Sequence, residues 1–207
     1  TLFTPILDIV NSDGSIGQGQ IVVNENWKSS PNAHYAAKET LNYQFNPIEY
    51  EIPGSNHIIQ ISPNVLRVFW KQRQIRSSSL EAGGQLFAEE NSNIIKISFA
   101  SGPSKEDRRR RNRFLPCRKA ENEVIRQMFK SSLHFVGDWH THPQQIPKPS
   151  SEDLQSIKEC FTLSVHDLNF FIMIIIGTTA FPKGIWVSLH SHEGFKRLGP
   201  IFDSENN

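Results

Sequence analysis

Two histidines and one aspartate at close spacing predict a metal site. His140 and His142 come at the end of an expected strand over residues 135–139, and Asp153 follows eleven residues after His142, in the first turn of an expected helix. Residues two apart in a strand point the same way, so both imidazoles can reach one ion. Two imidazoles and one carboxylate leave the fourth tetrahedral position of zinc open for water. This ligand set is typical of a catalytic rather than a structural zinc site.

Two further side chains could complete the chemistry. Water activated by zinc needs a general base that takes its proton and passes it to the leaving group, and Glu81 is the best candidate. Gly83 and Gly84 follow it, where larger side chains would crowd an approaching substrate backbone. Ser150 lies three residues before Asp153 and could donate a hydrogen bond to the oxyanion that forms on the attacked carbonyl.

Apolar patterns predict the elements that must hold these residues. Ser62 and Pro63 predict the start of a helix, and three prolines make residues 140–151 a rigid, non-helical loop. The alternation of strands and helices indicates an α/β fold, with a mixed central sheet flanked by helices. Strands are expected over residues 58–61, 80–88, 93–100, 135–139, 170–176 and 184–189, and helices over 63–70, 120–131 and from 151 onward.

Composition narrows the classes of protein that remain. The 207 residues are 37% hydrophobic and 21% charged, with a net charge of +1, so no overall field favours nucleic acid or a membrane. The longest apolar run, residues 170–176, is far shorter than the ~20 residues of a membrane helix. Two cysteines exclude a disulfide framework. We therefore expect a globular protein in a reducing compartment, the cytoplasm.

The chain divides into one full domain and an appendage. We expect the main domain over residues 57–207 and an N-terminal extension or fused segment over residues 1–56. The first part has a strand candidate at 19–24 and a short helix candidate at 33–43. Residues 13–16, together with Trp27, also resemble the back half of a ubiquitin-conjugating E2 fold, but that segment has no cysteine and so could not conjugate.

The site residues together resemble the motif of the JAMM (JAB/MPN) metalloproteases. That motif is a Glu followed by Gly-Gly, then His-x-His, seven residues and Ser-x-x-Asp, and every functional position is filled here. The resemblance implies a cytidine-deaminase-like fold with one zinc ion per chain. It implies that His140, His142 and Asp153 bind the zinc, that Glu81 is the acid and base, and that Ser150 steadies the tetrahedral intermediate.

The neighbouring residues resemble a narrower group, the bacterial JAB peptidases of CBASS anti-phage operons. The shared positions are 137–143, 147–150, 107–108 and 113–114. Those peptidases act beside an E1–E2-like conjugating enzyme and remove a cGAS-like nucleotidyltransferase from its covalent targets. The resemblance implies an isopeptidase that cleaves the amide after the C-terminus of a conjugated nucleotidyltransferase or ubiquitin-like protein. RadC-like proteins share the Pro-x-Pro-Ser-x-x-Asp ending but have Asn where this chain has Thr141.

The arginine-rich stretch at residues 108–113 is the strongest local charge feature. Such a run is usually a solvated loop, and docking of an acidic substrate or contact with phosphate are the sharper alternatives. Phe114 is expected to anchor the loop to the core. The candidate substrate-binding residues are Gly83, Gly84, Arg108, Arg109, Arg110 and Arg111.

Two other functional classes stay open. A non-catalytic MPN scaffold is disfavoured because such domains lack part of the metal motif, and a RadC-like role with nucleic acid is supported by the arginines alone. A second His-x-His, at His190 and His192, is not expected to bind metal because Pro200 stands where the motif has Ser.

Overall fold

The computed structural model describes residues 45–91 and 93–201 of the chain. The strand and helix expected at 19–24 and 33–43, and the segment that resembles an E2 fold, lie outside these residues. No helix in the described part of the chain is long and apolar enough to cross a membrane.

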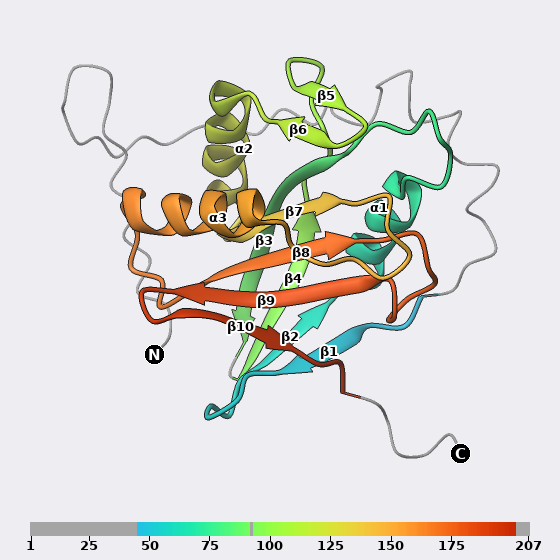
Figure 1. Ribbon diagram of the computed structural model, residues 1–207. Helices are drawn as coiled ribbons and strands as arrows, with labels where there is room; N and C mark the ends of the chain where they lie inside the picture. Colours follow the sequence, from blue (N-terminus) through green and yellow to red (C-terminus); the bar gives the residue numbers. More distant parts are fainter. Residues whose placement is uncertain (1–44, 92, 202–207) are drawn as a thin grey trace, which may run out of the picture.

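The described residues form ten strands and three helices (Figure 1). The helices are α1 (Pro63–Gln72), α2 (Arg118–Lys130) and α3 (Ser151–Leu163). The strands are β1 (Ile48–Glu51), β2 (Ile58–Ile61), β3 (Gly83–Asn91), β4 (Ile94–Ala100), β5 (Arg108–Arg110), β6 (Arg113–Leu115), β7 (His134–Thr141), β8 (Phe171–Ile176), β9 (Ile185–Ser191) and β10 (Gly194–Leu198).

Eight strands form one mixed sheet in the order β1-β2-β4-β3-β7-β8-β9-β10. The pairs β2–β4 and β7–β8 are parallel and the other pairs are antiparallel. The sheet nearly closes on itself, because Tyr50 forms a bridge with Pro200 and the Ile201 N–H donates to the Glu49 carbonyl at 2.8 Å. The predicted α/β class with a mixed sheet and flanking helices is confirmed.

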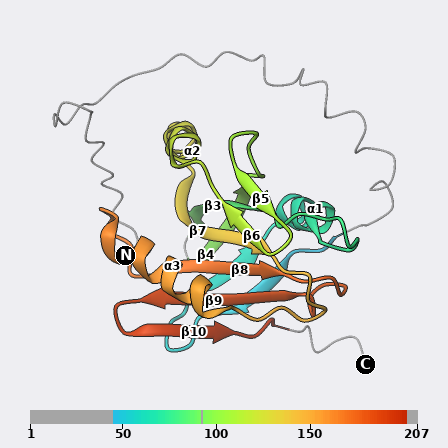
Figure 2. The same ribbon diagram turned by 45° about the horizontal axis from the view of Figure 1, so that its top comes forward.

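Strand β8 is buried on both faces, because α3 covers one face and the larger core lies against the other. Figure 2 shows α3 lying along β8 and β9. Ile157 and Phe161 of α3 pack on one face of the strand, and the opposite face joins the larger core, which contains Val65, Leu66 and Phe69 of α1. The β8 residues facing α3 are Phe171, Met173 and Ile175, and those in the larger core are Ile172, Ile174 and Ile176.

Strand β1 lies on the N-terminal side of the domain boundary expected at residue 56. It pairs with β2 through a turn in which Gly54 has a φ of +81°, a conformation that favours glycine. Since Tyr50 is also 1% exposed, the sheet of the main domain begins before residue 56.

Two segments differ from the sequence expectation. The arginine-rich stretch, expected as a loop, contains a hairpin made by β5 and β6. The sequence does not predict strand β10, because its residues have no alternating apolar pattern. In the structure four of its five residues are exposed. It forms because β9 provides a ladder of backbone hydrogen-bonding groups beside it.

Candidate metal centre

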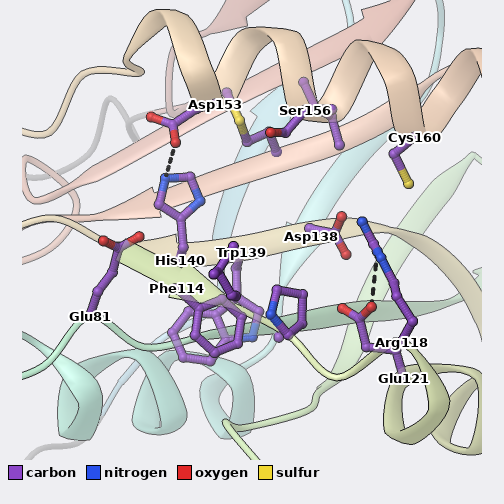
Figure 3. A pocket seen from close by; sticks show the side chains of 15 residues that line it. Glu81, Phe114, Arg118, Glu121, Asp138, Trp139, His140, Asp153, Ser156 and Cys160 are labelled. Atoms are coloured by element: carbon purple, nitrogen blue, oxygen red, sulfur yellow. Dashed lines mark hydrogen bonds and ion pairs between the residues drawn. The ribbon is translucent and has the colours of Figure 1, made fainter. Parts of the chain in front are cut away.

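The alternation of side chains in β7 directs His140 toward α3. Trp139 and Thr141 are buried on the side of α1, where the Trp139 ring centroid lies 5.0 Å from that of Phe69. His140, between them, therefore points to the opposite face. The first turn of α3 lies there, and Figure 3 shows His140 directed at Asp153.

Asp153 is fixed by a capping box at the start of α3. The Asp153 N–H donates to Ser150 Oγ at 3.2 Å, and the Ser150 N–H donates to Asp153 Oδ2 at 2.7 Å, so two free N–H groups of the helix end are satisfied. The Ser150 hydroxyl also donates to Asp153 Oδ2 at 2.7 Å. Ser150 thus positions Asp153, and its expected contact with an oxyanion stays a prediction.

The three predicted ligands converge with spacings that suit zinc. The two Nε2 atoms of His140 and His142 are 3.2 Å apart. The Nε2 of His140 lies 3.4 Å from Asp153 Oδ1, and that of His142 lies 3.4 Å from Asp153 Oδ2. Ligand atoms around a tetrahedral zinc, with bonds of about 2.0–2.1 Å, are separated by about 3.3 Å. Each histidine nitrogen lies beside a different oxygen of Asp153, so the three side chains gather at about this separation and the donor set fits a zinc ion.

The register between β3 and β7 brings Glu81 to the same place. Gly83 lies opposite His140, so the chain before it runs toward His142 in this antiparallel pair. One carboxylate oxygen of Glu81 and one ring nitrogen each of His140 and His142 lie within 4.8 Å of one another. Glu81 is 7% exposed. A base at this position can reach a water molecule held beside the imidazoles.

The pKa values of the two carboxyl groups in the site, Glu81 and Asp153, are shifted in opposite directions. Burial raises the pKa of Glu81 to about 7, while charge on His142 lowers it and charge on Asp153 raises it. Burial acts in the same direction on Asp153, but hydrogen bonds with His140 and His142 outweigh it and hold the pKa of that carboxyl well below its ordinary range. Burial works against charge on His142, yet Asp153 and Glu81 raise the pKa of its imidazole. A raised pKa suits a base and a lowered one suits a permanent anionic ligand.

Gly83 and Gly84, which the sequence analysis expects to let a substrate backbone lie against their strand, do not lie at an open sheet edge. Strand β3 is an interior strand, because β4 and β7 flank it. A Cβ at Gly83 would lie 2.6 Å from the Phe114 ring, and one at Gly84 would collide with the Ser101 carbonyl. The Phe114 ring and the Ser101 carbonyl therefore occupy the space beside these glycines, and Phe114 packs against β3 as the sequence predicted. Gly84 also lines a hollow next to the predicted ligands, so the contact of the two glycines with substrate stays a prediction.

Two hollows meet at the predicted ligands. One, of about 700 Å³, lies between the β6 side and the start of α3, and it is lined in part by Arg113 and Gln144. The other, of about 200 Å³, extends between α2 and α3 (Figure 3). Glu81 and Asp153 line both hollows. A substrate chain could therefore approach the site from two directions.

Sequence reasoning missed Asp138, which lines the smaller hollow. Burial raises the pKa of its carboxyl to about 7, and charge on Glu121 also raises it, against a lowering effect of Arg118. Glu121 and Arg118 form an ion pair of 2.9 Å. Asp138 precedes His140 by two residues in the same strand, so the period of β7 was the signal that could have found it.

The candidate substrate-binding arginines differ from one another. Arg109 and Arg111 donate their guanidinium hydrogens to backbone carbonyls, whereas Arg108 and Arg110 expose their side chains to solvent. The second His-x-His does not form a common site in the structure. His190 Nε2 lies 2.9 Å from Ser188 Oγ, and the His192 ring packs against Phe161.

The fold and this site together define a class of protein. A family model described as the prokaryotic homologs of the JAB domain matches residues 62–189, which is more than half of the chain and includes Glu81, Ser150 and all three predicted ligands. The chain therefore belongs to the JAB-domain family, in its prokaryotic branch.

Particular relatives narrow the comparison. A protein of Escherichia coli (strain TW11681) named CD-NTase/cGAS isopeptidase is 29% identical over 146 residues, covering 69% of this chain and 88% of its own length. A protein of Vibrio cholerae serotype O1 with the same name is 27% identical, covering 67% of this chain and 86% of its own length.

Two solved structures match this chain at lower sequence identity than the relatives above. The solution structure of DSY2949 from Desulfitobacterium hafniense has a TM-score of 0.48 and 18% identity, covering 66% of this chain and 87% of its own. A protein from Salinibacter ruber has a TM-score of 0.43 and 15% identity, covering 70% of this chain and 92% of its own.

Proposed function

We propose that the protein is a zinc-dependent isopeptidase that cleaves the amide after the C-terminus of a conjugated cGAS-like nucleotidyltransferase. The observation that carries this proposal is the convergence of three zinc-type donors with Glu81, a base within 4.8 Å of the two histidine nitrogens. The names of the E. coli and V. cholerae relatives support the choice of substrate. Cleavage would reverse conjugation in an anti-phage defence system of the CBASS type.

His140, His142 and Asp153 would hold the zinc ion. Bound zinc supplies a Lewis acid and lowers the pKa of its water toward ~7. The low pKa of Asp153 keeps this ligand charged, and the capping box holds it in place. The buried Thr141 between the histidines holds β7 against the Glu81 segment.

Glu81 would move the proton during cleavage. With a pKa raised to about 7, its carboxylate can accept a proton from the attacking water and then deliver it to the leaving lysine amine. Ser150 would donate its hydroxyl hydrogen to the oxygen of the attacked carbonyl, after turning away from Asp153 Oδ2. The two hollows would take the acyl side and the amine side of the scissile bond.

The test is cleavage of a nucleotidyltransferase or ubiquitin-like fusion in which the C-terminal amide is the only scissile bond. The native protein should cut it, with one zinc ion per chain, and a chelator should stop the reaction. Glu81→Ala should retain zinc and lose cleavage. His140→Ala should lose both, whereas His192→Ala, the matched change in the second His-x-His, should lose neither.

Three results would contradict different parts of the proposal. Cleavage by Glu81→Ala at the native rate would remove Glu81 from the mechanism. Stoichiometric zinc without cleavage would leave the metal centre but reject the substrate. Absence of zinc from the native protein would reject the site and favour a non-catalytic scaffold, and salt-dependent DNA binding would favour the RadC-like role.

A further inference from the structure

The arginine hairpin, which we define as residues 108–115, holds both backbone groups of Glu81. The Glu81 N–H donates to the Arg110 carbonyl at 2.8 Å. The Arg109 Nε donates to the Glu81 carbonyl at 2.7 Å, and Arg109 Nη2 donates to the Leu80 carbonyl at 3.3 Å. Both groups therefore depend on neighbouring residues of one short hairpin.

The same hairpin holds the chain further upstream of Glu81. Arg111 Nη1 donates to the carbonyls of Arg76 and Ser77 at 3.0 and 2.6 Å. The Arg111 carbonyl accepts from Gln74 Nε2 at 2.7 Å, and Gln74 Oε1 accepts from the Thr141 hydroxyl at 3.1 Å. Gln74 is 2% exposed, so this link between the hairpin and β7 is shielded from water.

These contacts matter because Glu81 lies outside any helix or strand. The segment between the end of α1 at Gln72 and the start of β3 at Gly83 has no regular hydrogen-bond ladder. Its position is therefore set by individual hydrogen bonds, which its carbonyls accept from the arginine hairpin and from Thr141 and its N–H groups donate to the same two places. A general base must lie within hydrogen-bond reach of the proton it takes, and small displacements are costly.

Arg109 differs chemically from its exposed neighbours. Among residues 45–91 and 93–201, the side chains of Arg108, Arg110 and Arg113 have no hydrogen bond or ion pair. Arg109 is partly buried, and its guanidinium donates hydrogen bonds to backbone carbonyls. Because of these bonds the Arg109 side chain is not available to bind an acidic surface, whereas the side chains of its neighbours are.

We propose that Arg109 is a positioning residue for Glu81, and that the arginine hairpin acts on catalysis by fixing the main chain that carries this base. The inference rests on the proposed role of Glu81. It replaces substrate docking as the function of Arg109 and leaves docking open only for the exposed arginines of the hairpin.

The first test needs no substrate. Amide hydrogen exchange over residues 80–82 should be about tenfold faster in Arg109→Gln than in the native protein. This factor corresponds to the loss of one hydrogen bond to a charged group, at the lower end of the usual strength of such bonds. Arg110→Gln is the matched control, because it removes a guanidinium from the same strand and keeps the carbonyl that accepts from Glu81. Its exchange over residues 80–82 should match the native protein. Unchanged exchange in Arg109→Gln would overturn the proposal.

The second test uses the cleavage reaction. Arg109→Gln should lower kcat by about 10- to 100-fold, with KM within about twofold and zinc retained, as expected for a displaced base. On the slow residual rate of Glu81→Ala, measured at high protein concentration, adding Arg109→Gln should cause no further loss, because Arg109 acts through Glu81. A further loss in that background would overturn the proposal. So would a salt-dependent rise in KM that is equal in Arg109→Gln and Arg110→Gln, because it would show that both arginines dock the substrate.

A conservative variant guards against general misfolding. Arg109→Lys keeps the charge and one donor but cannot reach two carbonyls with a planar fork, so its kcat and its exchange should fall between those of the native protein and Arg109→Gln. If Arg109→Gln unfolds, Arg109→Lys decides: native values for both measurements overturn the proposal. If the native protein cleaves nothing, the proposed function fails while the exchange experiment still tests the contact.

Discussion

Thr141 and Ala82 are joined by two hydrogen bonds. The Thr141 N–H donates to the Ala82 carbonyl at 2.8 Å, and the Ala82 N–H donates to Thr141 Oγ1 at 3.0 Å. Thr141 stands between the two histidines, and Ala82 follows Glu81. This pair therefore connects the strand with the predicted zinc ligands directly to the segment with the predicted base.

The hydroxyl of Thr141 should stabilise the fold and the site. Thr141→Val keeps the shape but leaves the Ala82 N–H and Gln74 Oε1 without this partner in a buried place. The free energy of unfolding should fall by about 1–3 kcal/mol, measured by urea denaturation. Thr141→Ser keeps the hydroxyl and should lose less. Equal losses in the two variants would show that the methyl group, not the hydroxyl, matters.

Asp153 should be needed for zinc but not for the fold. Asp153→Asn can still accept from the Ser150 N–H, so α3 should keep its start. Its zinc content after dialysis should fall far below one per chain, because a charged ligand is lost. Added zinc should raise the Tm of the native protein, because zinc binds the folded state and not the unfolded chain. It should leave the Tm of Asp153→Asn unchanged. Glu152→Gln, an exposed neighbour, should bind zinc normally; equal zinc retention in both variants would exclude Asp153 as a ligand.

Glu81 should make the metal-free protein less stable as pH rises. Its pKa is raised from 4.5 to about 7 in the folded state, so the folded protein holds this proton more tightly than the unfolded chain. The stabilisation is complete below pH 4.5 and is lost as pH rises through about 7, by about 3 kcal/mol in all. Glu81→Gln should remove this dependence, measured by urea denaturation at pH 5 and pH 8 with a chelator present. The same pH dependence in both proteins would show that Glu81 is not buried as the structure has it.

His190 should make the protein less stable as pH falls, which is the opposite of the pH dependence expected from Glu81. Burial lowers the pKa of its imidazole to about 4, below the ordinary value of 6.5. The unfolded chain binds the proton more tightly, so stability falls as pH drops from 6.5 toward 4. In urea denaturation at pH 7 and pH 5, His190→Gln should lose less stability between the two pH values than the native protein. His192→Gln is the control, because its side chain is exposed, and it should behave as the native protein does.

Gly84 should be required by the packing of β3. A Cβ there would collide with the Ser101 carbonyl, so Gly84→Ala should destabilise the protein by about 1–3 kcal/mol. Gly102→Ala is the matched control, since a Cβ at Gly102 meets nothing within 4 Å. The comparison is made by denaturant midpoint. A Gly84→Ala protein as stable as Gly102→Ala would mean that the loop at Ser101 moves aside easily.

Signals within a few residues predict the local parts of the fold and identify the candidate site residues. Apolar patterns predict β2 and β4, the continuous apolar run at residues 170–176 predicts β8, and the Ser62-Pro63 pair predicts the start of α1, because these signals act within a few residues. The spacing from His140 to Asp153 is also local, since one strand, one rigid loop and one helix start connect them.

How distant segments meet depends on the packing of the whole molecule. Strand β10 forms because β9 lies beside it, and the arginine stretch forms a hairpin whose guanidinium groups bond to residues 76–81. The register that brings Glu81 to His142 depends on pairing between β3 and β7, which are more than 40 residues apart in the chain. Burial, which raises the pKa of Glu81 and of Asp138, is likewise a property of the packed molecule. Residue types and spacing can name such groups, but backbone pairing and exclusion of water from their surroundings arise only when the whole sheet is assembled.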